Sequence, residues 1–204
     1  MSFVSIVKRE YKFLNNYYIE RKFRKVIPPS VSGVITSEDS SVHWKYLDVK
    51  DKIVLDLGCG LWEVSDLREA SPVYFKNKEA KKIIGVDPNE KDISTLKNYF
   101  SEHFPGDGSE FLVKLIATTD DLTELIAKYQ IESLKCDIEG FEKVMFSIDK
   151  SQIKSIVNIS VEYHDRQLFL GLLKTLNNWG FKIINHSLFT YASQKMGVLT
   201  AERS

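Results

Sequence analysis

From Lys52 onward, short apolar runs alternate with segments of helical periodicity, and this alternation constrains the fold more than any other feature. Before Gly180 the apolar runs cover residues 53–57, 82–87, 111–117, 134–137 and 156–163. Helical patterns lie near 64–70, 90–101, 120–129, 139–148 and 166–179. Strands that are apolar throughout are buried on both faces. The order therefore predicts an α/β fold with a mostly parallel sheet and helices on both of its faces.

The chain closes with a different pattern. Gly180 is a natural helix stop, and the apolar runs 181–184 and 197–200 follow it with only a turn between them. Two successive strands without a crossover helix must pair antiparallel. We therefore expect a Rossmann-like sheet of seven strands that ends in an antiparallel hairpin.

Size, charge and cysteine content narrow the class of protein. The chain has 204 residues, of which 43% are hydrophobic, with 28 basic and 28 acidic side chains. We predict one domain over 48–204 and an appendage over 1–47. No run approaches the roughly 18 apolar residues of a membrane span, so no membrane insertion is expected. Cys59 and Cys136 fit no metal or redox spacing, which is typical of a reduced, cytoplasmic protein.

The appendage is basic and aromatic. Residues 6–25 have the periodicity of an amphipathic helix, and Pro28 and Pro29 end it. Aromatic side chains interleaved with lysine and arginine can bind RNA through stacking and phosphate contacts. Packing of the aromatic side chains onto the domain is the interpretation we favour, and the sequence leaves the oligomeric state open.

The first two strands carry a nucleoside-site pattern. Glycines beyond a strand let a ligand approach the backbone, and an acid after the next strand can bind both ribose hydroxyls. The residues of this candidate site are Asp56, Gly58, Cys59, Gly60, Asp87, Pro88 and, from the fourth strand, Asp137. Asp56 is expected to accept a hydrogen bond from the amino group of the ligand. The alternative is an ordinary turn flanked by solvated acids. A nicotinamide site is disfavoured because its third glycine would fall at Glu63.

The fourth and fifth strands end in chemically reactive side chains. Asp137 and Glu139 follow the fourth strand, and Glu162 and His164 share one side of the fifth. Adjacent parallel strands would gather all four around one mouth, where ligands of open α/β sheets bind. The alternatives are a helix cap for Asp137, a helix-dipole contact for Glu139 and a half-buried packing role for His164.

Two motifs resemble known enzymes. The D-x-G-x-G pattern of Asp56, Gly58 and Gly60 resembles motif I of the class I S-adenosylmethionine-dependent methyltransferases. The segment G-V-D-P over 85–88 resembles the acidic loop that follows it. The resemblance implies an S-adenosylmethionine cofactor. Trp62 replaces a glycine that is usual in the family, and its indole would narrow the methionine pocket or cover it.

The later motifs resemble one family in particular. The segment 135–142 reads K-x-D-x-E-G-x-E, and it resembles the FkbM family of methyltransferases together with 161–164 and the T-x-D-D-L start at 118–122. The resemblance extends over about 48–201. It implies O-methylation of a sugar or another small-molecule hydroxyl.

The residues at the mouth suit that chemistry. A hydroxyl must lose its proton to act as a nucleophile, and His164 is the best candidate base. Glu139 or Asp137 would orient the acceptor, or help to hold a divalent cation with Glu162 and His164. We do not predict a metal site from the sequence. An RNA methyltransferase and a non-catalytic nucleoside-binding module remain as alternatives, although an Asn/Asp-Pro-Pro-aromatic loop for base-amine methylation is absent.

Overall fold

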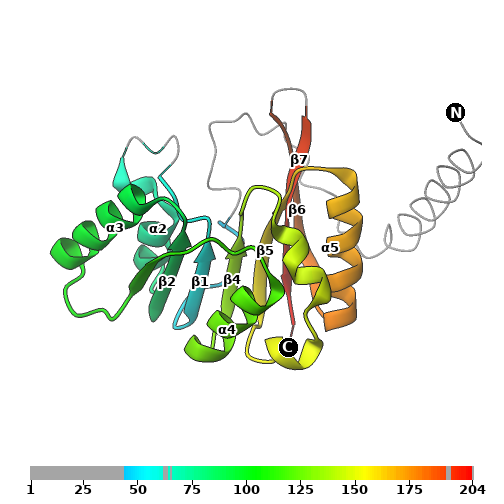
Figure 1. Ribbon diagram of the computed structural model, residues 1–204, viewed down its shortest axis with the longest axis horizontal. Helices are drawn as coiled ribbons and strands as arrows, with labels where there is room; N and C mark the ends of the chain where they lie inside the picture. The colour runs from blue at the N-terminus through cyan, green and yellow to red at the C-terminus, as the bar shows by residue number, and fades with distance from the viewer. Residues whose placement is uncertain (1–43, 62–63, 65, 192–193, 204) are drawn as a thin grey trace, which may run out of the picture.

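A computed structural model describes residues 44–61, 64, 66–191 and 194–203 (Figure 1). Within these residues, seven strands form one sheet in the order β3-β2-β1-β4-β5-β7-β6. The strands are β1 (Ile53–Leu57), β2 (Lys82–Asp87), β3 (Glu110–Val113), β4 (Ser133–Cys136), β5 (Asn158–Tyr163), β6 (Lys182–Tyr191) and β7 (Gln194–Glu202). The pairs from β3 to β5 are parallel, whereas β7 runs antiparallel to both β5 and β6. The predicted Rossmann-like fold with a terminal hairpin is confirmed.

Helices cover both faces of the sheet. They are α2 (Ser71–Asn77), α3 (Glu90–His103), α4 (Thr119–Tyr129) and α5 (Arg166–Trp179), with short 3-10 helices η2 (Leu67–Glu69), η3 (Glu142–Ser147) and η4 (Lys150–Ile153). Figure 1 shows α2 and α3 beside β1 and β2, and α4 and α5 on the side of β4 and β5. Leu55 and Leu57 point into the core under α4 and α5, whereas Val54 points into the core under α2 and α3. Strand β1 is therefore buried on both faces, as its apolar run predicted.

The strand register sets where chemistry can occur. Because β1, β2, β4 and β5 are parallel, their carboxyl ends lie at one edge of the sheet. The hairpin rises beyond this edge: β7 pairs with β5 only as far as Gly197 opposite Tyr163, while the β6–β7 ladder continues to Tyr191 opposite Gln194. The hairpin backbone thus forms a wall beside the end of β5.

Before Gly180, three elements differ clearly from the sequence prediction. The helix expected at 64–70 begins at Ser71, because Asp66 caps only a single 3-10 turn and Pro72 starts α2. The third strand ends at Val113, which pairs with the last residue of β2, so the ladder has no partner beyond it. The helix expected over 139–148 is the 3-10 helix η3, which begins only after a left-handed turn at residues 139–140.

The start of the described chain packs onto the domain. Trp44 and Leu47, in the predicted appendage, are buried in the same core as α2 and α3. The predicted helix over 6–25 lies outside the described residues. None of the helices that the structure describes has the length and apolar character needed to cross a bilayer.

Candidate functional site

The glycine loop lies flat against two strands. Gly58 has a φ of +73°, and a Cβ atom placed on it would lie 1.6 Å from the backbone oxygen of Asp137. Its N–H donates to the backbone oxygen of Val86 at 2.9 Å. Only glycine combines this conformation with this approach. The loop after β1 is therefore in direct backbone contact with the segment after β4.

Asp87 holds the far side of the loop. Its Oδ2 accepts from the N–H of Gly60 at 3.0 Å, and its Oδ1 accepts from the N–H of Asn89 at 2.8 Å. A carboxylate has about four acceptor sites, so about two remain for other donors. Pro88 is exposed beside it. Asp92, which the sequence analysis missed, accepts from the N–H of Leu61 at 3.0 Å.

Asp56 has a different role from the one expected. Its carboxylate is fully buried, accepts from the hydroxyl of Ser71 at 2.6 Å and lies 3.3 Å from Nζ of Lys135. It is not presented to a ligand as the sequence analysis expected, because the core under α2 encloses it. The thiol of Cys59 is also buried, and burial raises its pKa. Cys59 can therefore offer a ligand only its backbone.

Lys135 is a second residue that the sequence analysis missed. It is 2% exposed, donates from Nζ to the backbone oxygen of Gly58 at 2.7 Å, and lies 3.8 Å from Oδ2 of Asp137. Burial lowers the pKa of Lys135, but Asp56 and Asp137 oppose this and raise it above its ordinary value. The side chain therefore stays charged. The sequence carried one indication of this role. Lys135 and Asp137 are two residues apart, so on an extended strand their side chains lie on the same face.

A strained turn follows β4. Glu139 has a φ of +51° and Gly140 a φ of +95°, a left-handed pair that only the glycine adopts without cost. Glu142 is fully buried, and its Oε1 accepts from the N–H groups of Ile138 and Gly140 at 3.1 and 3.3 Å. In the E-G-x-E segment, residues 139–140 thus form the turn, and the carboxylate of Glu142 closes it. Glu142 was also missed by the sequence analysis.

Four acidic side chains surround His164. Its Nε2 lies 3.5 Å from Oε2 of Glu162, 3.6 Å from Oε1 of Glu142 and 4.0 Å from Oε2 of Glu139. The side chain of Asp137 is hydrogen-bonded to Glu162. One possible ligand atom from each of Asp137, Glu162 and His164 lies within 4.8 Å of the other two. The predicted gathering of these residues at the carboxyl ends of β4 and β5 is what the structure shows.

Burial and like charge shift the pKa values in this cluster. Burial, with the hydrogen bond and charge of Asp137, raises the pKa of Glu162 to about 11. Burial also raises the pKa of Glu139, with a further contribution from Asp137. Burial lowers the pKa of His164, but Glu142 and Glu139 outweigh it and the net shift is upward. The cluster therefore holds protons more strongly than separate side chains would.

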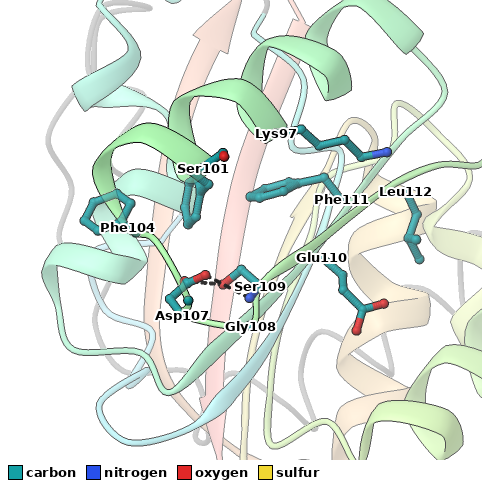
Figure 2. Close-up of a pocket in the computed structure, with 11 residues that line it drawn as sticks. Lys97, Ser101, Phe104, Asp107, Gly108, Ser109, Glu110, Phe111 and Leu112 are labelled. Carbon is teal, nitrogen blue, oxygen red and sulfur yellow. Dashed lines mark hydrogen bonds between the residues drawn. The ribbon is translucent and has the colours of Figure 1, made fainter.

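A hollow lies away from this edge. Figure 2 shows it between the second half of α3 and β3, with Ser109 hydrogen-bonded to Asp107 at its floor. Its volume is about 480 Å³, and Lys97, Phe104 and Phe111 are among the residues that line it. Its lining includes no residue of the glycine loop, β4 or β5. We therefore assign the candidate site to the polar carboxyl edge rather than to this hollow.

The fold and this edge place the protein among the Rossmann-like α/β proteins. A glycine loop after β1, an acid after β2 and polar side chains after β4 and β5 lie together at the carboxyl edge of a Rossmann-like sheet, where ligands of such folds generally bind. No protein-family model matches the chain, and no curated protein matches its sequence.

Solved structures share the fold at low sequence identity. A protein of the NADB-Rossmann superfamily from Streptococcus agalactiae is 14% identical, with a TM-score of 0.55 over 85% of this chain and 71% of that one. The tRNA methyltransferase TrmK of B. subtilis is 13% identical, with a TM-score of 0.53 over 84% of this chain and 68% of its own. TrmK of M. capricolum, solved with S-adenosyl-homocysteine, is 10% identical, with a TM-score of 0.52 over 84% and 70%. These similarities establish a Rossmann-like fold.

Proposed function

We propose that the protein is an S-adenosylmethionine-dependent methyltransferase that methylates a hydroxyl group of a small-molecule or carbohydrate acceptor. The contact between Gly58 and the backbone oxygen of Asp137 carries the proposal. It places the loop suited to a nucleoside directly beside the side chains suited to an acceptor. Methyl transfer needs this adjacency, because the reacting atoms must be held about 3–3.5 Å apart.

The residues at β1 and β2 fit the cofactor. The loop at residues 58–60 lies beside Asp87, and Asp87 retains acceptor capacity for the two ribose hydroxyls. In this proposal Asp56 acts indirectly, by fixing Lys135 against the loop. The bound S-adenosyl-homocysteine of the M. capricolum enzyme, which shares the fold, supports the same choice of ligand.

The residues at β4 and β5 fit a hydroxyl acceptor. A hydroxyl needs a group that takes its proton, and in the metal-free protein His164 is our candidate. The carboxylates around it would stabilise the imidazolium that forms, as the aspartate of a catalytic triad does. Asp137 and Glu139 would orient the acceptor. Membership of the FkbM family is part of this proposal, supported by the K-x-D-x-E-G-x-E segment and the turn that it forms.

Calorimetry and an activity assay test the proposal together. Wild-type protein should bind S-adenosylhomocysteine with one site per chain. Asp87→Ala should weaken binding by about 100-fold or more, because two hydrogen bonds to a charged acceptor are lost. Asp66→Ala, which removes an exposed acid paired with Arg68, is the control and should bind normally. Unchanged binding by Asp87→Ala would refute the assigned site.

His164→Ala separates binding from turnover. It should bind S-adenosylhomocysteine like the wild type and lose about 100-fold or more of the methyl transfer to an accepted hydroxyl substrate. Full activity in this variant would remove His164 from the proposal. Cofactor binding without transfer to any acceptor in a broad panel would favour a non-catalytic nucleoside-binding module.

RNA is the second candidate acceptor. Residues 1–29 carry seven lysines and arginines against two glutamates, and two of the structures that share the fold are tRNA methyltransferases. RNA binding through these cations should weaken steeply with salt. The double variant Lys22→Glu/Arg24→Glu in the full chain should then lose affinity and show a smaller salt slope. Wild-type protein that does not bind RNA at low salt would exclude this candidate.

A further inference from the structure

The cluster around His164 has spacings that hydrogen bonds do not explain. The distances from Nε2 of His164 to Oε2 of Glu162 and Oε1 of Glu142 are 3.5 and 3.6 Å. Hydrogen bonds between nitrogen and oxygen are usually about 2.7–3.2 Å long. Two ligand atoms on one ion, each bonded at about 2.1 Å, lie roughly 3 to 4 Å apart. The observed separations match a shared ion better than a direct bond.

Two buried atoms in the cluster lack partners. Among the described residues, Nε2 of His164 and Oε2 of Glu142 are inaccessible to solvent and have no hydrogen-bond partner. Glu142 is fully buried, and its carboxylate faces His164. Buried polar atoms are nearly always satisfied, by protein, water or an ion. These two atoms therefore point to a ligand at this place, independently of the number of acids.

The charges also favour a cation. Asp137, Glu139, Glu142 and Glu162 converge on one imidazole, and the buried lysine beside them divides its charge between Asp137 and Asp56. Several carboxylates so close together repel one another unless protons or cations offset their charge. A divalent ion would supply two positive charges at their common centre.

We infer that Asp137, Glu162 and His164 form a binding site for one divalent first-row transition-metal ion. One imidazole nitrogen with two carboxylate oxygens suits Mn²⁺ or Zn²⁺ better than the all-oxygen preference of Mg²⁺ and Ca²⁺. The three ligand atoms lie within 4.8 Å of one another, so rotation of one carboxylate would bring all three within bonding distance of a single ion. The fully buried Glu142, whose Oε1 lies 3.6 Å from the same Nε2 atom of His164, would lie beside the ion and add to the negative charge around it.

The role of this ion rests on the proposed function. Three protein ligands leave a coordination position open toward the carboxyl edge, where the acceptor would lie. A hydroxyl bound there would lose its proton more readily, and the O–H bond would break with transfer of the proton to a carboxylate. Glu139, which is exposed at the rim, is placed to receive it. In the loaded protein His164 would thus be a ligand rather than the base.

Manganese binding tests the inference directly. The full-length chain, dialysed against a chelator and then freed of it, would be titrated with Mn²⁺ while free Mn²⁺ is followed by electron paramagnetic resonance. We expect one saturable site per chain. His164→Asn and Glu162→Gln should each weaken it by at least about 10-fold. Glu110→Gln is the matched control. It removes a carboxylate on β3 that accepts hydrogen bonds from Lys82 and Tyr129, and it should leave Mn²⁺ binding unchanged.

Two further measurements decide the outcome. Each variant's unfolding midpoint in chelator shows whether it folds, and if Glu162→Gln does not fold, the more exposed His164→Asn decides. Absence of a saturable site for both Mn²⁺ and Zn²⁺ in the wild type, or a site that survives His164→Asn, would overturn the inference. Calorimetry with S-adenosylhomocysteine separates this failure from failure of the proposed function, because Asp87→Ala tests cofactor binding at a residue outside the cluster.

Discussion

Lys135 connects the two halves of the site. From one buried position on β4 its ammonium group donates to the glycine loop, pairs with Asp56 and approaches Asp137. It also lies 5.8 Å from the centroid of the Trp44 ring, so an aromatic face shields it from solvent. A lysine so enclosed costs desolvation energy, and its retention makes sense if it fixes the loop beside the acceptor residues.

Lys135→Met should therefore be strongly destabilising. Removing one member of a buried pair leaves the other charge uncompensated, which costs about 3–5 kcal/mol. Chemical denaturation measures the loss. The double variant Lys135→Met/Asp56→Asn should recover most of it, because the fully buried partner is then neutral and Asp137, which is partly exposed, can be solvated. A single-variant loss below about 1 kcal/mol would show that the pair is not a structural hub.

Gly58 and Gly106 form a matched pair of glycines. Both have a left-handed backbone, with φ of +73° and +79°, but only Gly58 is in close contact with another segment. Gly106→Ala should cost about 1 kcal/mol of backbone strain. Gly58→Ala adds the clash with Asp137 and should cost about 3 kcal/mol or more and abolish S-adenosylhomocysteine binding. Equal losses in the two variants by denaturation would contradict the packing described for the loop.

At the scale of elements, the sequence patterns located the strands better than the turns. The runs 53–57 and 82–87 coincide with β1 and β2, because apolar residues buried on both faces leave a clear signal. The left-handed backbone of Glu139 gave no such signal in the sequence, because a glutamate side chain does not favour that conformation. The partners of Asp56 were equally hidden, because Ser71 and Lys135 approach it only through the fold.

The start of α5 determines where His164 lies. Asp165 follows His164 directly and caps the helix, with its Oδ1 accepting from the N–H of Leu168 at 2.7 Å. Asp165→Ala should lose about 1 kcal/mol of stability and weaken Mn²⁺ binding, because the chain after β5 is no longer held. Asp165→Asn keeps the cap and should restore both. Denaturation measures the stability, and the Mn²⁺ titration measures the affinity. Wild-type stability and affinity in Asp165→Ala would show that the cap does not influence the site.

At the scale of the whole molecule, the sequence predicted one sheet edge as the site, and the structure gathers the expected residues there. The contact of Gly58 with Asp137 and the cluster at His164 bring the two groups of predicted residues together at one edge of the sheet. What the sequence did not predict is the layer beneath, where Lys135 and Glu142 hold the two loops. Such support depends on side chains that meet across strands, which one-dimensional spacing records only weakly.

Stability should depend on pH through a buried histidine. The ring of His186 bonds to the hydroxyl of Tyr163 at 2.6 Å, and burial lowers its pKa below the ordinary 6.5. The unfolded chain then binds a proton that the folded chain refuses, so the contribution of His186 to stability is fully present above about pH 6.5 and is lost as the pH falls below it. The slope is at most about 1.4 kcal/mol per pH unit.

Denaturation at pH 7.5 and pH 5.5 checks this expectation. On acidification the wild type should lose stability relative to His186→Asn, because only the wild type carries the contribution of His186. His103→Asn, which changes an exposed histidine on α3, controls for the number of histidines. An identical acid loss in the wild type and His186→Asn would contradict the assignment.

A crystal structure of the protein with S-adenosylhomocysteine is the decisive test of the proposed site. We expect the nucleoside over residues 58–60, its ribose hydroxyls on the carboxylate of Asp87, and its sulfur facing Asp137, Glu162 and His164. A nucleoside bound in the hollow between α3 and β3, or a carboxyl edge that stays empty at saturating ligand, would contradict it.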